Sequence, residues 1–170
     1  MQDNNNYITV KCIEVKQPIG VFYIATIEWY DINNIARADI RRIERGEGGQ
    51  VETYLGMQRR LSDSRVKEIS QYVQNIDATF PTGIILHINS FSDDFRNVIF
   101  DKDKSEMQIR VNENVATILD GQHRIEGLKK GLGETHKHST KFQLNVSIFV
   151  DLDMDNQSMV FATVNKAQTK

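Results

Sequence analysis

The sequence is poor in cysteine. Cys12 is the single thiol in 170 residues, which excludes an internal disulfide and a four-cysteine zinc site. It lies in the stretch YITVKCIEV, whose alternation of apolar and polar residues is typical of a strand with one buried face. We therefore expect Cys12 to be a small residue of the core.

Long apolar runs and a strong positive charge are also missing. No apolar run approaches the roughly 18 residues that cross a bilayer. The start MQDNNNYITV has neither the basic head nor the apolar stretch of a secretory signal, so we expect a cytoplasmic protein. The formal net charge is −2 and the pI is about 6.1, which argues against binding nucleic acid through a whole-molecule positive field. Any such contact would need a local basic patch.

The sequence contains enough apolar residues to form a hydrophobic core. Hydrophobic residues make up 39% of the sequence and charged residues 26%, which predicts a single domain over residues 1–170. Tyr7–Val15 and Val21–Ile27 read as two antiparallel strands joined by the turn KQPIG. Further strands are expected at 84–88, 107–111, 115–119 and 142–150, and helices at 61–76 and 155–167. Strands and helices mixed without strict alternation indicate an α+β fold.

The helix expected at 61–76 has the clearest pattern. Four apolar residues recur at spacings of three and four, and Ser62 or Asp63 can cap its start. These apolar residues are Val66, Ile69, Val73 and Ile76.

An arginine-rich stretch, ARADIRRIERGEGGQ, precedes that helix. We interpret it as a short helix followed by a mobile loop, and its basic residues are Arg37, Arg41, Arg42 and Arg45. Interleaved acidic residues largely cancel their charge, which favours a solvated helix. Contact with DNA phosphates is the alternative.

The stretch LDGQHRIEGLKKGL carries the main candidate site. Asp-Gly between apolar runs normally signals a β-hairpin, but Ile125, Leu128 and Leu132 follow at helical spacing. A strand, a tight turn and a helix aim free backbone N–H groups and the positive end of the helix dipole at one spot, which suits phosphate.

Each residue of this turn has an expected role. Gly121 would allow close backbone approach or a positive φ, and His123 and Arg124 would donate to phosphate oxygens. Asp120 would cap the helix or help to hold a metal ion. The alternative is a capped helix with an exposed histidine and arginine.

DGQHR at Asp120–Arg124 resembles the name-giving motif of the DGQHR-domain proteins. These form a branch of the ParB/sulfiredoxin-like fold that includes the Dnd-type B component of DNA phosphorothioate systems and relatives in deazaguanine DNA modification. GMQRRLSDSRVKEISQYV (Gly56–Val73) resembles the Gln-Arg element of the family, and MVFATVNKAQTK (Met159–Lys170) resembles its later helix. The three blocks cover roughly residues 56–170 in the expected order.

The resemblance implies a mixed sheet flanked by helices and a nucleotide site. In the wider fold the matching turn cradles the phosphates of ATP or CTP, which implies a site for ATP or another NTP built from Gly121, Gln122, His123 and Arg124. If the NTP is hydrolysed with Mg²⁺, Asp120, His123 and Arg124 would be the catalytic residues. Sulfiredoxins carry their nucleophilic cysteine where this chain has Gln122, which argues against reductase chemistry. DGQHR proteins are usually longer, so the chain is either a short member or part of a longer protein.

Two further pairs could complete the pocket. Arg59 and Arg60 precede the helix at 61–76 and could form a second wall; a solvated basic turn is the alternative. Asn165 and Gln168 are three residues apart on one helical face, where they could read a base or ribose edge or remain ordinary surface amides.

Two other clusters have a simpler interpretation. HKH at 136–138 lacks a third ligand for zinc. Asp151, Asp153 and Asp155 lack the glycine and the glutamate of a calcium loop, so we expect them to act as capping residues.

The sequence thus predicts an NTP-binding module, with hydrolysis as an extension, of a bacterial DNA-modification or phage-defence system. The competing class is a non-enzymatic DNA-binding regulator. A third is a subunit that docks to other proteins of such a system and whose pocket has lost its ligand. Homo-oligomers are compatible with all three. These three interpretations share one fold, and a fold alone does not determine function.

Overall fold

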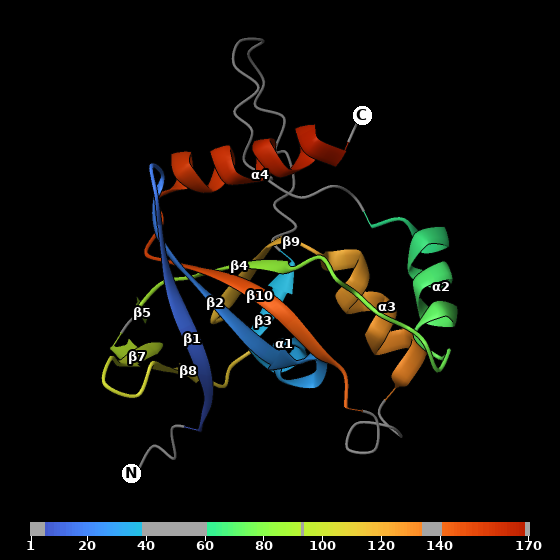
Figure 1. Cartoon of the computed structure of the whole chain (residues 1–170), viewed down its shortest axis with the longest axis horizontal. Coiled ribbons are helices and arrows are strands. Elements are labelled where there is room, and N and C mark those ends of the chain that lie inside the picture. The colour runs from blue at the N-terminus through green and yellow to red at the C-terminus, as the bar shows by residue number, and fades with distance from the viewer. Residues whose placement is uncertain (1–5, 39–60, 93, 134–140, 169–170) are drawn as a thin grey trace.

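A mixed eight-stranded sheet forms the centre of the computed structural model, which describes residues 6–38, 61–92, 94–133 and 141–168 (Figure 1). The strand order is β3-β9-β4-β10-β2-β1-β8-β7. Pairing is parallel for β10 with β4 and for β3 with β9, and antiparallel elsewhere in the sheet. The expected α+β class is therefore confirmed.

The strands of this sheet are β1 (Tyr7–Gln17), β2 (Gly20–Glu28), β3 (Ala36–Ala38), β4 (Ile84–Ile88), β7 (Val98–Asp101), β8 (Glu106–Arg110), β9 (Ala116–Asp120) and β10 (Gln143–Val150). A separate small pair consists of β5 (Phe91–Ser92) and β6 (Phe95–Arg96). The helices are α1 (Trp29–Ile35), α2 (Asp63–Tyr72), α3 (Gln122–Leu132) and α4 (Met154–Gln168). The strands predicted from alternation and apolar runs are all present, and β1 and β2 form the expected antiparallel pair with Cys12 opposite Ala25.

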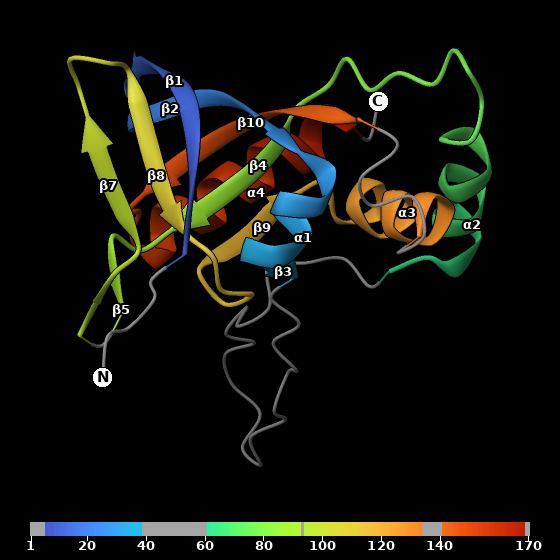
Figure 2. The ribbon, with the colours of Figure 1, turned by 90° about the horizontal axis from the view of Figure 1, so that it is seen from below.

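Helices cover both faces of the sheet (Figures 1 and 2). The main core packs α1 and α3 against one face. Leu86 and Ile148 of the sheet and Leu128 of α3 all belong to it, and each is fully buried. The other face packs against α4, where Phe22, Phe149 and Val160 form a smaller buried cluster. Cys12 belongs to the main core as predicted, and burial raises the pKa of its thiol.

The helix near the arginine-rich stretch lies earlier than expected. Trp29, Ile32 and Ile35, three residues apart, bury one face of α1 in the main core, so the helix ends before Arg37. Ala36–Ala38 instead pair in parallel with β9, and Arg37 is an exposed residue of this edge strand. The expected helix at Arg37 is therefore wrong, because pairing with β9 overrides local propensity. Arg41, Arg42 and Arg45 lie outside the described residues.

The helix expected at 61–76 ends earlier than predicted, at Tyr72. The N–H groups of Gln74 and Asn75 bond back to the carbonyl oxygens of Gln71 and Tyr72, three residues earlier, which tightens the chain into turns. Ile76, the last apolar residue of the predicted helix, consequently lies beyond the helix and is fully exposed, with a relative exposure of 108%.

Helix α2 packs on α3, and the two helices run in the same direction. Ser62, just before α2, bonds to His123 at the start of α3, whereas Gly131 near the end of α3 lies against Ser70 and Val73. Two glycines, Gly127 and Gly131, face α2 along this contact. Their missing side chains let the two helices approach closely. In the described part of the chain, no helix is long and apolar enough to cross a membrane.

Candidate functional site

The turn between β9 and α3 has the predicted strand–turn–helix geometry. Strand β9 ends at Asp120, Gly121 takes a left-handed conformation with φ +101°, and α3 begins at Gln122. The Gly121 carbonyl oxygen accepts the N–H groups of Arg124 at 3.0 Å and of Ile125 at 3.1 Å. The predicted helix after Asp-Gly and the positive φ of Gly121 are confirmed.

Gly121 is required for a second reason. A Cβ built on Gly121 would lie 2.3 Å from Cδ1 of Ile84 and 3.3 Å from a guanidinium nitrogen of Arg124. A side chain here would therefore be strained in its backbone and would collide with β4. The close approach of a ligand to Gly121 stays a prediction.

Arg124 holds the turn to the segment before β4. Its guanidinium donates to the carbonyl and hydroxyl oxygens of Thr82, to the Gly83 carbonyl oxygen at 2.9 Å and to the Asp120 carboxylate at 3.0 Å. We call this set of bonds the Arg124 clasp. The side chain is only 16% exposed, and burial lowers the pKa of Arg124 from its ordinary value, opposed by Asp120 and assisted by Arg65.

The clasp changes the expected roles of two residues. Asp120 does not cap α3, because its carboxylate pairs with Arg124 and the N-cap is Gly121, with no side-chain hydrogen bond. The predicted phosphate contact of Arg124 stays a prediction, and its guanidinium already has four acceptor contacts within the protein.

His123 joins the start of α3 to the start of α2. The backbone N–H of Ser62 donates to Nε2 of His123 at 3.0 Å. When this imidazole is neutral, its proton must therefore lie on Nδ1. Ser62 also caps α2, since its Oγ accepts the N–H of Arg65, which confirms the predicted N-cap. Gln122, the residue before His123, is buried.

The result is a pair of helix N-termini held at one spot. Because α2 and α3 run in parallel, the positive ends of their dipoles add there. The exposed guanidinium of Arg65 lies in the first turn of α2 and is close enough to lower the pKa of Arg124. Reasoning from the sequence missed Arg65, although it stands three residues after a predicted N-cap, where a side chain lies beside the helix start.

The remaining predicted site residues are placed as follows. Arg59 and Arg60 lie outside the described residues, as does the HKH stretch at 136–138. Asn165 and Gln168 belong to α4, on the face of the sheet opposite α3, and their side chains are also outside the described part. The structure therefore brings together Asp120, Gly121, His123 and Arg124 with Ser62 and Arg65.

The aspartates before α4 behave partly as expected. The Asp153 carboxylate accepts the N–H of Asn156 at 2.8 Å, which caps α4 and confirms its predicted role. Asp151 instead accepts the N–H of Ser90 at 2.7 Å, and thereby fixes the end of β10 to the segment after β4. Among the residues that the structure describes, no three or more His, Cys, Asp or Glu side chains gather as metal ligands would.

A buried histidine lies beneath α4. His87 of β4 is 3% exposed, and its Nε2 lies 3.4 Å from Nε2 of the buried Gln157 in α4. Burial lowers the pKa of His87, while the charge of Asp151 partly opposes this effect. No local pattern signals this contact, because the two residues are 70 positions apart.

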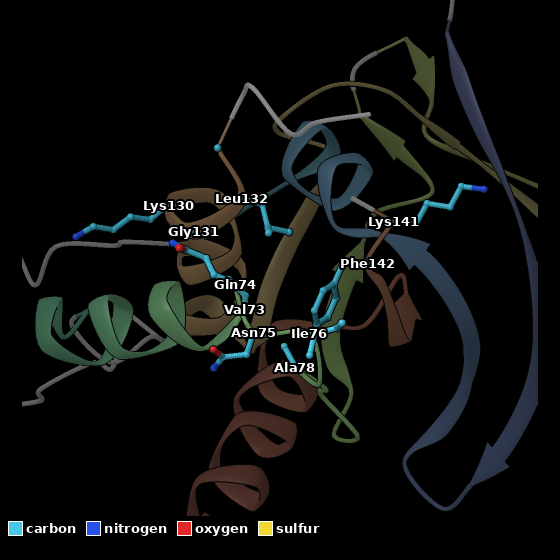
Figure 3. A pocket seen from close by; sticks show the side chains of 11 residues that line it. Val73, Gln74, Asn75, Ile76, Ala78, Lys130, Gly131, Leu132, Lys141 and Phe142 are labelled. Carbon is cyan, nitrogen blue, oxygen red and sulfur yellow. The ribbon is translucent and has the colours of Figure 1, made fainter. Parts of the chain in front are cut away.

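Two pockets lie away from the Gly121 turn. One, of about 830 Å³, opens at the C-terminal ends of α2 and α3 (Figure 3). The other, of about 520 Å³, lies between α1, β3 and α3. Neither is lined by residues of the Asp120–Arg124 turn.

Comparison with known proteins defines the class of this chain. The family model DndB, described as DNA-sulfur modification-associated, matches residues 10–170. The chain therefore belongs to the DndB family, and its context is a DNA-sulfur modification system. This confirms the Dnd-type relation predicted from the three sequence blocks. No curated protein and no solved structure matches the chain.

Proposed function

We propose that the chain is the nucleotide-binding module of a DNA-sulfur modification system and holds the phosphates of an NTP at the joined starts of α2 and α3. The observation that carries this proposal is the bond from the Ser62 N–H to Nε2 of His123, because it fixes two helix N-termini at one point. Helix N-termini bind anions through their first N–H groups and their dipoles. The mixed sheet flanked by helices and the DGQHR motif support a ParB/sulfiredoxin-like module.

The residues of the site divide into contacts and supports. Arg65 is the exposed cation of the paired helix starts, and we assign it a direct charge-assisted bond to phosphate. His123, Gln122 and Gly121 would contribute from the first turn of α3. Arg124 acts as a positioning residue, because the clasp sets the angle at which α3 leaves the sheet. Arg59 and Arg60 directly precede α2 in sequence, and in this proposal they add positive charge to the phosphate site.

Magnesium and hydrolysis belong to the same proposal. Mg²⁺ is usually bound by substrate phosphates with only one or two carboxylates, so a three-carboxylate cluster is not required. Asp120 is the carboxylate of the turn, where it would face the metal while keeping its bond to Arg124. Hydrolysis would then use Asp120 and His123 beside the phosphates.

A thermal-shift screen tests the proposal. The protein is mixed with ATP, CTP, GTP and dNTPs, each with and without Mg²⁺. A nucleotide that binds the folded protein must raise the Tm, because at a hundredfold excess over Kd it adds ~2.7 kcal/mol to the free energy of unfolding. Arg65→Ala should weaken the binding roughly ten- to a hundredfold in isothermal titration, the worth of a charge-assisted bond.

Lys67→Ala is the matched control, because Lys67 is an exposed cation on the same helix, two residues further from its start. It should leave the nucleotide affinity unchanged. Absence of a shift with any nucleotide, together with tight duplex DNA binding that weakens steeply with salt, would replace this proposal by the DNA-binding regulator.

A further inference from the structure

Few buried groups hold α4 on its face of the sheet (Figures 1 and 2). In the part of the helix whose side chains are described, Gln157 and Val160 are the buried residues. Val160 packs with Phe22, Leu119 and Phe149, a cluster much smaller than the main core. An element with little buried apolar contact opens locally at a lower free energy than the rest of a protein. Helix α4 is therefore the element whose seating depends most on its polar contacts.

The buried Gln157 faces the buried His87 across this contact. The Nε2 atoms of the two residues lie 3.4 Å apart. The same Gln157 nitrogen donates to the Leu152 carbonyl oxygen at 2.7 Å, so the amide presents its NH₂ group to the imidazole. A protonated Nε2 on His87 would place two donors opposite each other. Nε2 of His87 must therefore lack a proton while α4 is seated.

The surroundings of His87 offer little to a charged imidazole. In the sheet His87 lies between Phe149 of β10 and Thr117 of β9, and neither side chain titrates in this pH range. Among the residues that the structure describes, Asp151 supplies the one charge that acts on His87. The Asp151 carboxylate already accepts the N–H of Ser90 at 2.7 Å. Burial of an ion without a bonded partner is costly, so the contact with α4 favours the neutral imidazole.

The chain between β10 and α4 provides a pivot. Asp151 has φ +56°, a left-handed conformation that turns the chain sharply after β10. Its N–H donates to the Ile88 carbonyl oxygen at 3.0 Å, and its carboxylate holds the N–H of Ser90. Both bonds tie Asp151 to the end of β4 and the residues after it. The sheet is thus fixed as far as Asp151, and α4 can swing about residues 152 and 153.

We propose that α4 is a hinged cover whose seating on the sheet is controlled by protonation of His87. With a neutral imidazole the helix lies on the sheet. When His87 takes up a proton, the opposed donors and the buried charge release the helix, and the imidazolium reaches water. Release exposes Phe22, Leu119 and Phe149, an apolar surface that the seated helix hides. This proposal does not depend on the NTP site, which lies at the starts of α2 and α3.

Release should begin near pH 6.5. In the released form the imidazole is solvated and titrates near its ordinary value of about 6.5, whereas burial in the seated form lowers the pKa of His87. The seated form is therefore fully favoured above about pH 6.5. Below it, the ratio of seated to released molecules should fall by up to about tenfold per pH unit, until the pH reaches the lowered pKa.

Hydrogen exchange followed by mass spectrometry tests the proposal on the whole chain. The exchange rate of α4 is measured between about pH 7.5 and 5.5 and divided into that of the unfolded chain at each pH, which removes the chemical effect of acid. This protection of α4 should fall by up to about tenfold between about pH 6.5 and 5.5. It should also be lower than that of α3 at every pH, because α3 belongs to the main core.

Low concentrations of urea separate release of α4 from global unfolding. Urea accelerates exchange in proportion to the surface that opening exposes, so α4 should respond less than α3. If α4 and α3 have the same protection and the same response to urea, α4 opens only when the whole protein unfolds, and the proposal is overturned.

Two variants test the histidine and its partner. His87→Gln cannot take up a proton, so the protection of α4 should no longer depend on pH. Gln157→Glu places a carboxylate beside His87 and stabilises the imidazolium, so the fall in protection should move to lower pH. Because this variant loses the donor to Leu152, its pH profile is compared with that of the parent and its absolute protection is not.

His123→Gln is the matched control, because His123 lies at the start of α3, on the other face of the sheet. It should leave the pH profile of α4 unchanged. A profile like that of the parent in His87→Gln would overturn the proposal. If His87→Gln does not fold, Gln157→Glu decides alone, and an unshifted profile in that variant would overturn control by His87.

Discussion

Gly131 of α3 lies so close to α2 that a Cβ on it would come within 2.4 Å of the carbonyl oxygen of Ser70. Replacing glycine by alanine inside a helix normally stabilises it by about 1 kcal/mol. Here the obstacle is backbone, which cannot rotate away, so Gly131→Ala should lower the free energy of unfolding by about 1–3 kcal/mol in urea titration. The exposed neighbour Lys130→Ala should stay within about 0.5 kcal/mol of the parent. A stabilised Gly131→Ala would show that the helices are further apart.

The Arg124 clasp predicts that replacing Arg124 lowers the stability of the protein, whereas replacing Arg65 does not. Arg124→Ala leaves the carbonyl oxygens of Thr82 and Gly83 and the Asp120 carboxylate without their donor, so it should destabilise the protein by about 2–3 kcal/mol. Arg124→Lys should recover only part, since an ammonium lacks the planar fork. Arg65→Ala should leave the Tm unchanged while weakening NTP binding. Equal melting temperatures for the Arg124→Ala variant and the parent would refute the clasp.

Gly121 and Ile84 form a pair that can be tested by rescue. Gly121→Ala should destabilise through its φ of +101° and through the contact of 2.3 Å with Cδ1 of Ile84. Ile84→Val removes that carbon, so the double variant should lose less than the sum of the two single losses, as measured by a double-mutant cycle. Gly20→Ala is the control, because Gly20 has φ +132° and nothing within 4 Å of the added carbon. It should show backbone strain alone, and Ile84→Val should not rescue it.

His87 predicts a loss of stability in mild acid. Burial lowers its pKa in the folded protein, whereas the unfolded chain takes up the proton near the ordinary value of about 6.5. The stabilising contribution of the neutral imidazole is therefore complete above about pH 6.5 and is lost as the pH falls below it. The free energy of unfolding, measured between about pH 7.5 and 5.5, should fall more steeply for the parent than for His87→Gln. Parallel curves would mean that His87 titrates normally.

Local patterns predicted the elements of this fold better than their contacts. Alternation identified β1 and β2, and helical spacing after Gly121 identified α3, because each pattern repeats within a few residues. The bond between Ser62 and His123 joins residues 61 positions apart, and the bonds of Arg124 to Thr82 span 42 positions. Such contacts depend on how the sheet and helices are packed, which no short motif encodes. The exposure of Ile76 escaped prediction because apolar spacing continued beyond the point where the helix ended.

The glycine contacts between α2 and α3 have a mechanical consequence. Gly127 and Gly131 seat Ile69 and Ser70 so tightly that α2 cannot slide along α3 without first separating from it. The two helices therefore translate and tilt as one rigid unit, anchored to the sheet through the core residues of α3. A displacement imposed at Ser62 and His123 should therefore also move Gly131 and the end of α2 that lies against it, because the close contact leaves the helices no room to slide.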